Sequence, residues 1–226
     1  PAVAVSQTDL RPALLLSTAD TIPEAREEAY RADQLADQGV RAFTDGDQLA
    51  AFDHWQEARL LYKIAGLPMK EARMLENLSV VYRLTSRPAE AINMSRQALD
   101  IYEALGVENE QPSAFLNLGS AYRLSGYLSD AIATYETSLS LYQQAADTTG
   151  ERIILSLLAD TYAEANDYSQ SIIFQKQVLE IAQRTGKAQI EAESLSELGY
   201  AHFVLESYDE SVEYFQTALT LFQQLG

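Results

Sequence analysis

The sequence predicts an all-α protein, an α-solenoid built from five antiparallel helix pairs. Two observations support this fold class. Written in rows of 40 residues from position 31, the chain aligns with itself without a gap, and a fixed period of this kind is the signature of a repeat architecture. Within each row, apolar residues recur every three or four positions, which is the spacing of one face of a helix.

Two columns of this alignment indicate how the helices pack. One column holds small residues in every row: Gly39, Ser79, Gly119, Ala159 and Gly199. The column three positions later is mostly tyrosine: Ala42, Tyr82, Tyr122, Tyr162 and His202. Small residues let two helix axes approach to about 8–10 Å. We therefore expect the helices of a pair to cross at the small column, with the tyrosines filling the space beside it.

Each row predicts two helices separated by a turn. The expected helices cover 23–43, 47–65, 69–84, 88–105, 111–124, 128–146, 150–164, 168–185, 188–204 and 208–225. Short oxygen side chains favour N-cap positions, and these are expected at Asp47, Ser129, Asp167 and Asp209. The position that follows a helix is often a glycine in the left-handed conformation. This role is expected for Gly66, Gly106, Gly186 and Gly226.

The third row carries a motif that resembles a known family. Leu118-Gly119-x-x-Tyr122 is followed by Ala131, Tyr135 and Ser138, a pattern similar to the tetratricopeptide repeat. The family's usual period is about 34 residues, so the longer rows imply a longer second helix. The 40-residue form resembles repeats of kinesin light chain and of bacterial regulatory proteins, notably cyanobacterial chains that place such repeats ahead of a caspase-like protease domain. HEAT and armadillo repeats have a similar length but lack the small and tyrosine columns.

The resemblance implies a right-handed superhelix made of five repeats. These repeats are 31–70, 71–110, 111–150, 151–190 and 191–226. The frame is weaker at Gln38, Ala42, Ser95 and Gln175, which depart from their columns. Residues 1–30 lie outside the rows, and we expect an N-terminal arm or capping segment that runs into the first helix, with a flexible linker as the alternative. Because the chain starts at Pro1 and ends at a repeat boundary, we expect it to come from a longer protein.

Composition excludes several classes of function. The chain has 226 residues, no cysteine and a formal net charge of −17, with 33 acidic and 16 basic residues. Nucleic acid is a poor partner for such a charge, because binding it depends on neutralising phosphates. No apolar run approaches the roughly 18 residues of a membrane span, and no intact signal peptide is recognisable. The absence of cysteine fits both the cytoplasm and a periplasm reached by a removed signal.

No catalytic constellation is recognisable, so we expect no enzyme, no catalytic residue, no cofactor and no metal site. The sequence lacks the nucleophile-elbow, phosphate-loop and dinucleotide-binding glycine patterns. His202 occupies the tyrosine column, which predicts a packed histidine with its hydrogen bonds satisfied. His54 is expected at the surface. An acidic cluster that binds a divalent ion stays possible in a chain of this charge, but no motif marks one.

Recognition is the function that remains. The first helices of stacked pairs line a concave surface, and the family resemblance implies that certain of their positions face this groove. The candidate peptide-binding residues are Arg73, Asn77, Val80, Arg83, Ser113, Asn117, Ser120, Arg123, Asp160, Glu197 and Tyr200. Asn77 and Asn117 share a column, and an amide can pair with both the N–H and the C=O of an extended peptide. Arg83 and Arg123 share another, and each can bind a carboxylate or form an exposed ion pair.

These observations predict a scaffold that binds an extended peptide or protein segment in the groove. The alternatives are a regulatory or sensor arm of a larger protein, for example a protease, and self-assembly through open repeat ends. The last helix ends with apolar Leu219, Leu221, Phe222 and Leu225, which favours a homo-oligomer through the C-terminal repeat. The Lys/Asn carboxylate clamp of chaperone-binding relatives is not reproduced, which disfavours chaperone C-termini as partners.

Overall fold

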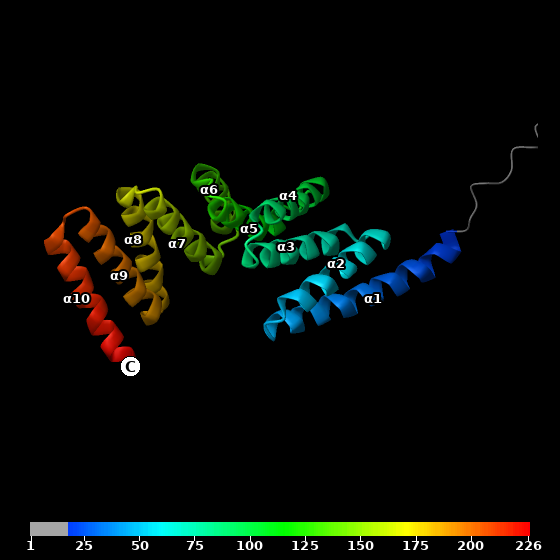
Figure 1. The fold of residues 1–226 in the computed structure, drawn as a ribbon, viewed down its shortest axis with the longest axis horizontal. Helices are drawn as coiled ribbons and strands as arrows, with labels where there is room; N and C mark the ends of the chain where they lie inside the picture. Colours follow the sequence, from blue (N-terminus) through cyan, green and yellow to red (C-terminus); the bar gives the residue numbers. More distant parts are fainter. Residues whose placement is uncertain (1–17) are drawn as a thin grey trace, which may run out of the picture. The chain divides into compact units, whose positions relative to one another are not determined.

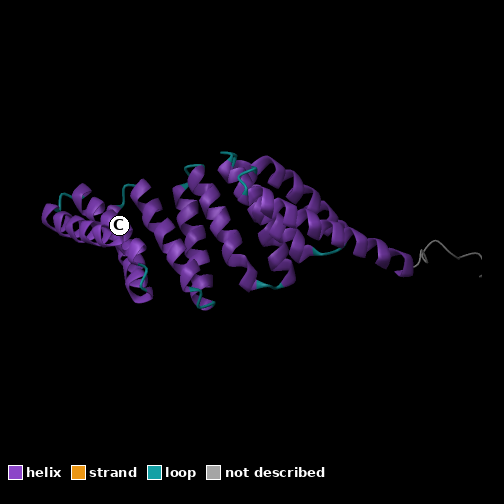
Figure 2. Cartoon of the chain, turned by 90° about the horizontal axis from the view of Figure 1, so that it is seen from below, coloured by secondary structure: helices purple, strands orange, loops and turns teal. Residues whose placement is uncertain are grey.

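The computed structural model describes residues 18–226, and helices account for nearly all of them (Figures 1 and 2). Within this part of the chain there are ten α-helices, one short 3-10 helix and no strand. The helices are α1 (Thr18–Thr44), α2 (Gln48–Ile64), α3 (Pro68–Leu84), α4 (Pro88–Leu105), η1 (Glu108–Glu110), α5 (Gln111–Leu124), α6 (Leu128–Gln144), α7 (Thr148–Glu164), α8 (Tyr168–Thr185), α9 (Ala188–Val204) and α10 (Tyr208–Leu225). They pack in sequence as antiparallel pairs, which confirms the predicted all-α repeat class.

The ten expected helices are all present, and most boundaries fall within two residues of the prediction. The largest difference is α1, which begins at Thr18 rather than at residue 23. The predicted N-terminal arm therefore lies mostly outside the described residues, and the part from Thr18 onward is helix continuous with the first repeat.

One residue in every turn between helices has a left-handed backbone conformation, and these residues are spaced 20 apart. They are Gly46, Gly66, Ser86, Gly106, Gly126, Ala146, Asn166, Gly186 and Glu206, with the last residue Gly226 also at positive φ. The same two backbone bonds close each turn. At Gly126, its own N–H donates to the carbonyl of Arg123 at 2.9 Å, and the N–H of Tyr127 donates to that of Tyr122 at 3.0 Å. The repeat of 40 residues is therefore two half-repeats with equivalent turns.

This turn explains which predicted caps were right. The residue directly after the left-handed one is the N-cap of the next helix, as at Asp47 and Asp167, whose carboxylates accept from the N–H groups of Ala50 and Gln170. Ser129 and Asp209 were wrong predictions. The N-caps there are Tyr127 and Ser207, so both residues lie inside the first helical turn.

The left-handed glycines Gly66, Gly106 and Gly186 are confirmed, each with φ of 66° or 67°. The four non-glycine residues at equivalent positions were not expected. A side chain strains this conformation, because the Cβ atom approaches the following carbonyl oxygen. The same two backbone bonds are present in these four turns, so the turn geometry is kept where the residue is serine, alanine, asparagine or glutamate.

The chain divides into two compact units, and the boundary lies between Met74 and Leu75, inside α3. In the first unit, α2 packs against α1. The hydroxyl of Tyr62 donates to Asp33 at 2.7 Å, and the ammonium of Lys70 lies 2.6 Å from the same carboxylate oxygen. Asp33 of α1 therefore binds one side chain from α2 and one from α3.

In the second unit, each helix from α4 to α10 contacts the next one along the chain. Its core is a series of small clusters, as expected where each repeat contacts only its neighbours. One cluster contains Ala131, Tyr135, Ile154 and Leu158, all fully buried. The next contains Leu155, Val178 and Ile181, and another contains Ile172, Leu198 and Ala201.

The small column packs against a different partner from the one we expected. A Cβ atom at Gly119 would lie 2.7 Å from the ring of Tyr135, and one at Gly199 would lie 2.9 Å from the ring of Phe215. In the second repeat the same two columns hold Ser79 and Ser95, whose hydroxyl oxygens are 2.7 Å apart. The ring above each glycine thus comes from 16 residues later, and not from the tyrosine column.

The tyrosine column packs on the second helix at another point. Tyr162 stacks on Phe174 with ring centroids 5.4 Å apart, and His202 stacks on Tyr214 at 5.2 Å. His202 is packed as expected, but both of its ring nitrogens are buried and have no hydrogen-bond partner among the described residues. The expectation of a satisfied histidine was therefore wrong. His54 is half-buried rather than fully at the surface.

Replacing Ala146 by glycine should stabilise the protein by about 0.5–1 kcal/mol. The left-handed conformation costs an alanine about 1–2 kcal/mol, and glycine returns part of that gain through the entropy of the unfolded chain. Urea unfolding followed by circular dichroism measures the difference. The reverse change, Gly126→Ala, is the matched control and should destabilise by a similar amount. Equal stabilities of Ala146→Gly and the parent chain would contradict the argument.

Candidate functional site

The candidate residues lie on the first helix of each pair. Arg73, Asn77, Val80 and Arg83 lie on α3; Ser113, Asn117, Ser120 and Arg123 on α5; Asp160 on α7; Glu197 and Tyr200 on α9. Arg73 belongs to the first unit and the others to the second. We call the surface formed by α5, α7, α9 and the end of α3 from Leu75 the first-helix surface. Asn117 is only 7% exposed, so its amide is largely covered by the chain itself.

Two of the candidate residues, Ser113 and Arg123, bind side chains of their own chain. Ser113 donates a hydrogen bond to Glu76 at 2.5 Å, and the hydroxyl of Tyr102 donates to the same carboxylate at 2.7 Å. This joins α3, α4 and α5 through one carboxylate. Ser113 therefore contributes to the contact between neighbouring repeats.

Arg123 already binds carboxylates of its own chain. Its Nε and a terminal nitrogen lie 2.9 and 2.7 Å from one oxygen of Glu164, and its other terminal nitrogen lies 3.7 Å from Asp160. Partial burial acts to lower the pKa of Arg123, but the bond with Glu164 and the nearby charges raise it overall. The cation at this position is neutralised by α7.

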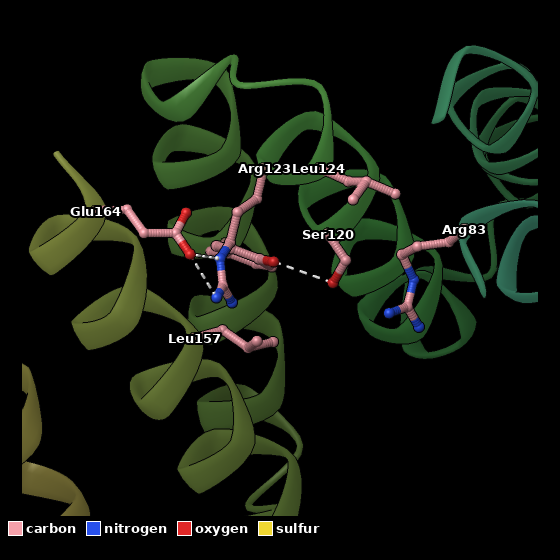
Figure 3. Close-up of a pocket in the computed structure, with 7 residues that line it drawn as sticks. Arg83, Ser120, Arg123, Leu124, Leu157 and Glu164 are labelled. Atoms are coloured by element: carbon pink, nitrogen blue, oxygen red, sulfur yellow. Dashed lines mark hydrogen bonds and ion pairs between the residues drawn. The ribbon is translucent and has the colours of Figure 1, made fainter. Parts of the chain in front are cut away.

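A hollow of about 380 Å³ lies beside this ion pair (Figure 3). Its lining residues are Arg83, Ser120, Arg123, Leu124, Tyr135, Leu157 and Glu164. The hydroxyl of Tyr135 donates to Ser120 Oγ at 3.0 Å. Arg83 lies on the opposite side of the hollow from Arg123 in the close-up, and its Nε is buried without a hydrogen-bond partner among the described residues. The hollow thus contains one paired and one unpaired guanidinium group.

Of the acidic candidates, Asp160 on α7 lies 3.7 Å from Arg123 of this hollow, and Glu197 on α9 is influenced by the charge of Asp160. Burial raises the pKa of the Asp160 carboxyl, the charge of Arg123 lowers it, and the charge of Glu164 raises it again, so the net shift is upward. Burial also raises the pKa of Glu197, and the charge of Asp160 adds to this effect. Tyr200 is half exposed and meets the ring of Tyr168 edge-on, with centroids 6.2 Å apart.

The structure therefore brings some predicted residues together and leaves others apart. Arg83, Ser120 and Arg123 line one hollow, and Asp160 connects it electrostatically to Glu197. Asn77 and Val80 are half-buried on α3 and do not line the hollow. Four residues that line the hollow were not among the candidates: Leu124, Tyr135, Leu157 and Glu164. Tyr135 was recognisable only as part of the repeat motif, and no sequence signal marked Leu157.

A second hollow of about 520 Å³ contains none of the predicted residues. It lies among α4, η1, α5 and α6, and is lined by Leu99, Glu103, Glu108, Gln111, Phe115, Thr137, Leu141 and Gln144. Its charged groups are both acidic. No group of three or more His, Asp or Glu residues suited to a metal ion is found in residues 18–226. None of the described helices is long and apolar enough to cross a membrane.

The pKa of Asp160 should rise further when Arg123 is replaced by glutamine, because the arginine charge now lowers it. It should fall when Glu164 is replaced by glutamine. Since the folded-state pKa lies above the ordinary value, ionisation of Asp160 opposes folding, and lowering the pH through this pKa should stabilise the fold. Carbon-detected NMR titration of the carboxyl group measures the pKa. A lower pKa in Arg123→Gln would contradict this account.

Comparisons with known proteins agree with the fold. Tetratricopeptide repeat profiles match residues 72–105, 110–184 and 192–224. BtubC from P. vanneervenii has the same fold, with a TM-score of 0.78 and 17% identity over 91% of this chain and 88% of its own. The nearly identical TPR-like repeats of a putative kinesin light chain from Podosopora anserina align with a TM-score of 0.74 and 14% identity, over 86% of this chain and 96% of theirs.

A third structure with this fold is a signal transduction ATPase with numerous domains (STAND) from Pyrococcus horikoshii, which has a tetratricopeptide repeat sensor. It aligns with a TM-score of 0.77 and 16% identity over 89% of this chain and 31% of its own. No curated protein matches the sequence closely enough to indicate a function. The structural likenesses are too distant in sequence to show more than the fold. The repeat profiles together cover more than half of the sequence, and the chain belongs to the tetratricopeptide repeat family.

Proposed function

We propose that this protein is a non-enzymatic scaffold that binds an extended segment of a partner protein along the first-helix surface. Tetratricopeptide repeats are generally protein interaction modules and are usually non-catalytic. The observation that carries the proposal is the series of polar side chains on successive first helices, from Arg83 on α3 through Ser120 on α5 to Asp160 on α7 and Glu197 on α9. An extended chain that crosses these helices meets one such group on each.

The charges along this surface give the proposed ligand a direction. The guanidinium of Arg83 is at the α3 end, the pair of Arg123 and Glu164 is in the middle, and Asp160 and Glu197 are toward α9. A segment that is acidic toward α3 and basic toward α9 is complementary to this order. Exposed Tyr200 and Phe203 add apolar surface at the α9 end.

The asparagine column is part of this proposal, with unequal roles for its two members. Helices of adjacent repeats are about 10 Å apart, and an extended chain rises about 3.3 Å per residue. Amides in the same column therefore match peptide groups about three residues apart. Asn77 is half-buried and available to a ligand, whereas the low exposure of Asn117 gives it a mainly structural role.

The partner can be recovered by pull-down from the source organism's extract and identified by mass spectrometry. Titration calorimetry should then show that Asn77→Ala weakens its binding about two- to tenfold, the effect of losing hydrogen bonds worth about 0.5–1.5 kcal/mol. Glu197→Gln should weaken a partner that is basic at that end, and the effect should diminish in salt. Asn93→Ala is the matched control, because this exposed asparagine lies on the second helix α4.

Unchanged affinity in both Asn77→Ala and Glu197→Gln would place the partner elsewhere on the protein. Asn117→Ala should in addition lower the free energy of unfolding, because the residue is buried. The regulatory or sensor arm of a larger protein stays a prediction. The sensor role of the repeats in the Pyrococcus horikoshii protein is consistent with it.

We infer a second function, self-association, from the apolar face of α10. Its residues Tyr208, Val212, Phe215, Leu219 and Phe222 follow one another at helical spacing and are 36–57% exposed. The equivalent positions of α8 include Ile172, Gln175 and Ala182, which are buried in a packed interface with α9. A second copy of α10 supplies the same apolar stripe in return, which is the self-complementary arrangement of a two-fold dimer.

The double variant Leu219→Glu, Phe222→Glu should be monomeric at concentrations where the parent chain self-associates. Carboxylates cannot be buried in such an interface without a partner charge. Sedimentation velocity over a concentration series measures the association. Gln223→Glu is the control, because it adds charge to the same helix beside the apolar stripe. A parent chain that stays monomeric at every concentration would refute self-association through this face.

A further inference from the structure

We propose that the hollow beside Arg83 binds the carboxylate of an acidic side chain, either aspartate or glutamate, in the partner segment. This assigns a ligand chemistry to one position of the first-helix surface, and it rests on the function proposed above. Three features of the hollow favour such a ligand: an unpartnered guanidinium, a hydroxyl with a free proton, and a net charge that matches one carboxylate.

The guanidinium of Arg83 is the group that the carboxylate would bind. Its Nε–H is buried and has no acceptor among the described residues, and a buried donor without a partner is unfavourable. Arginine presents its N–H groups in a planar fork that matches both oxygens of a carboxylate. Arg83 lines the hollow (Figure 3). Only Nε of this group is buried without a partner, so an acid seated in the hollow would meet its terminal N–H groups.

Ser120 supplies a second hydrogen-bond donor. Tyr135 donates its own proton to Ser120 Oγ at 3.0 Å. A serine hydroxyl has one proton to donate and accepts through its lone pairs, so the proton of Ser120 remains for a ligand. The bond from Tyr135 also holds the serine oxygen in place, because Tyr135 is fully buried. The pair therefore presents an oriented donor at the wall of the hollow.

The charges of the lining favour a single negative charge. Arg83, Arg123 and Glu164 are the charged residues that line the hollow. Arg123 and Glu164 neutralise each other at 2.7 Å, which leaves one positive charge in a protein whose formal net charge is −17. The nearby carboxylate of Asp160 opposes a more highly charged group. One carboxylate is thus a better match than a phosphate, which carries about −1.5 to −2 at neutral pH.

The size and the apolar wall favour a side chain over a small free ion. A volume of about 380 Å³ exceeds the needs of a carboxylate alone and falls in the range of pockets that hold small organic groups. Leu124 and Leu157 line the hollow beside the polar groups. They offer an apolar contact for the methylene groups of a glutamate whose carboxylate reaches Arg83.

The test uses N-acetyl-glutamate α-amide, which carries only a side-chain carboxylate, as the probe of the intact protein. The Nε–Hε signal of Arg83 and the backbone amide signal of Leu124, a lining residue that every variant retains, should shift and saturate in proton–nitrogen NMR spectra as the probe is added. N-acetyl-glutamine α-amide, the neutral isostere, should cause no saturable shift. Ser120→Ala should weaken binding about two- to tenfold and Arg83→Gln by tenfold or more, in line with the loss of a neutral and a charged hydrogen bond. Arg184→Gln, an exposed arginine on α8, is the matched control and should bind as the parent does.

Several outcomes would overturn the assignment. They are a shift of the Leu124 amide that Arg83→Gln does not abolish, an equal response to the glutamine analogue, and no saturable shift at all. Tighter binding of N-acetyl-leucine, whose only carboxylate is at the chain end, would replace the side chain by a C-terminus. Tighter binding of inorganic phosphate would replace it by a phosphorylated residue. If the recovered partner responds to Asn77→Ala but not to Arg83→Gln, the scaffold function stands and this inference fails alone.

Discussion

The left-handed turn that recurs every 20 residues is the constraint on which the rest of this structure depends. A helix ends with carbonyl groups that have no partner within the helix, and two backbone bonds in each turn satisfy some of them. Because the next helix starts directly after the left-handed residue, each turn also sets where the following face begins. Apart from α1 and α5, the helices are consequently 17 or 18 residues long, and equivalent positions meet equivalent neighbours from one pair to the next. The contact of Gly119 with Tyr135 recurs between Gly199 and Phe215 for this reason.

The small-residue column shows how the array tolerates sequence change. A glycine on the first helix faces an aromatic ring on the second, while in the second repeat two serines face each other and bond. Ser95 is a departure from its column when a single row is considered, but it is fully buried against Ser79. Ser95 is much smaller than the aromatic ring at the equivalent position of the other repeats, and Ser79 is only slightly larger than the glycine it replaces. The hydrogen bond between the two serine hydroxyls compensates for the lost contact. Between repeats of this chain, the contact between the two facing positions is therefore kept, although the residue type at each position changes.

Most of the fold was predictable from the sequence because it follows from local periodicity. The ten helices and the glycine turns needed only apolar spacing and the conformational freedom of glycine. The non-glycine turns at Ala146 and Glu206 were not predictable, because there the backbone bonds override side-chain preference. For the candidate site, helical spacing and the family resemblance placed residues on the first helices. The pairing of Arg123 with Glu164 and the burial of Asn117 depend on how neighbouring helices cover each other, and a helix considered alone contains no such information.

The turn within a helix pair and the turn between two pairs have the same geometry. This has a consequence for how such a chain can change its length. Two antiparallel helices make one repeat, so gain or loss of a 40-residue segment leaves every later helix in the same orientation. A 20-residue segment bounded by the same turns could be inserted without disturbing local backbone geometry. It would, however, reverse the direction of every helix that follows and exchange the first helices of the later pairs with the second ones. Local structure therefore permits steps of half a repeat, and only a binding surface shared across several helices demands whole repeats.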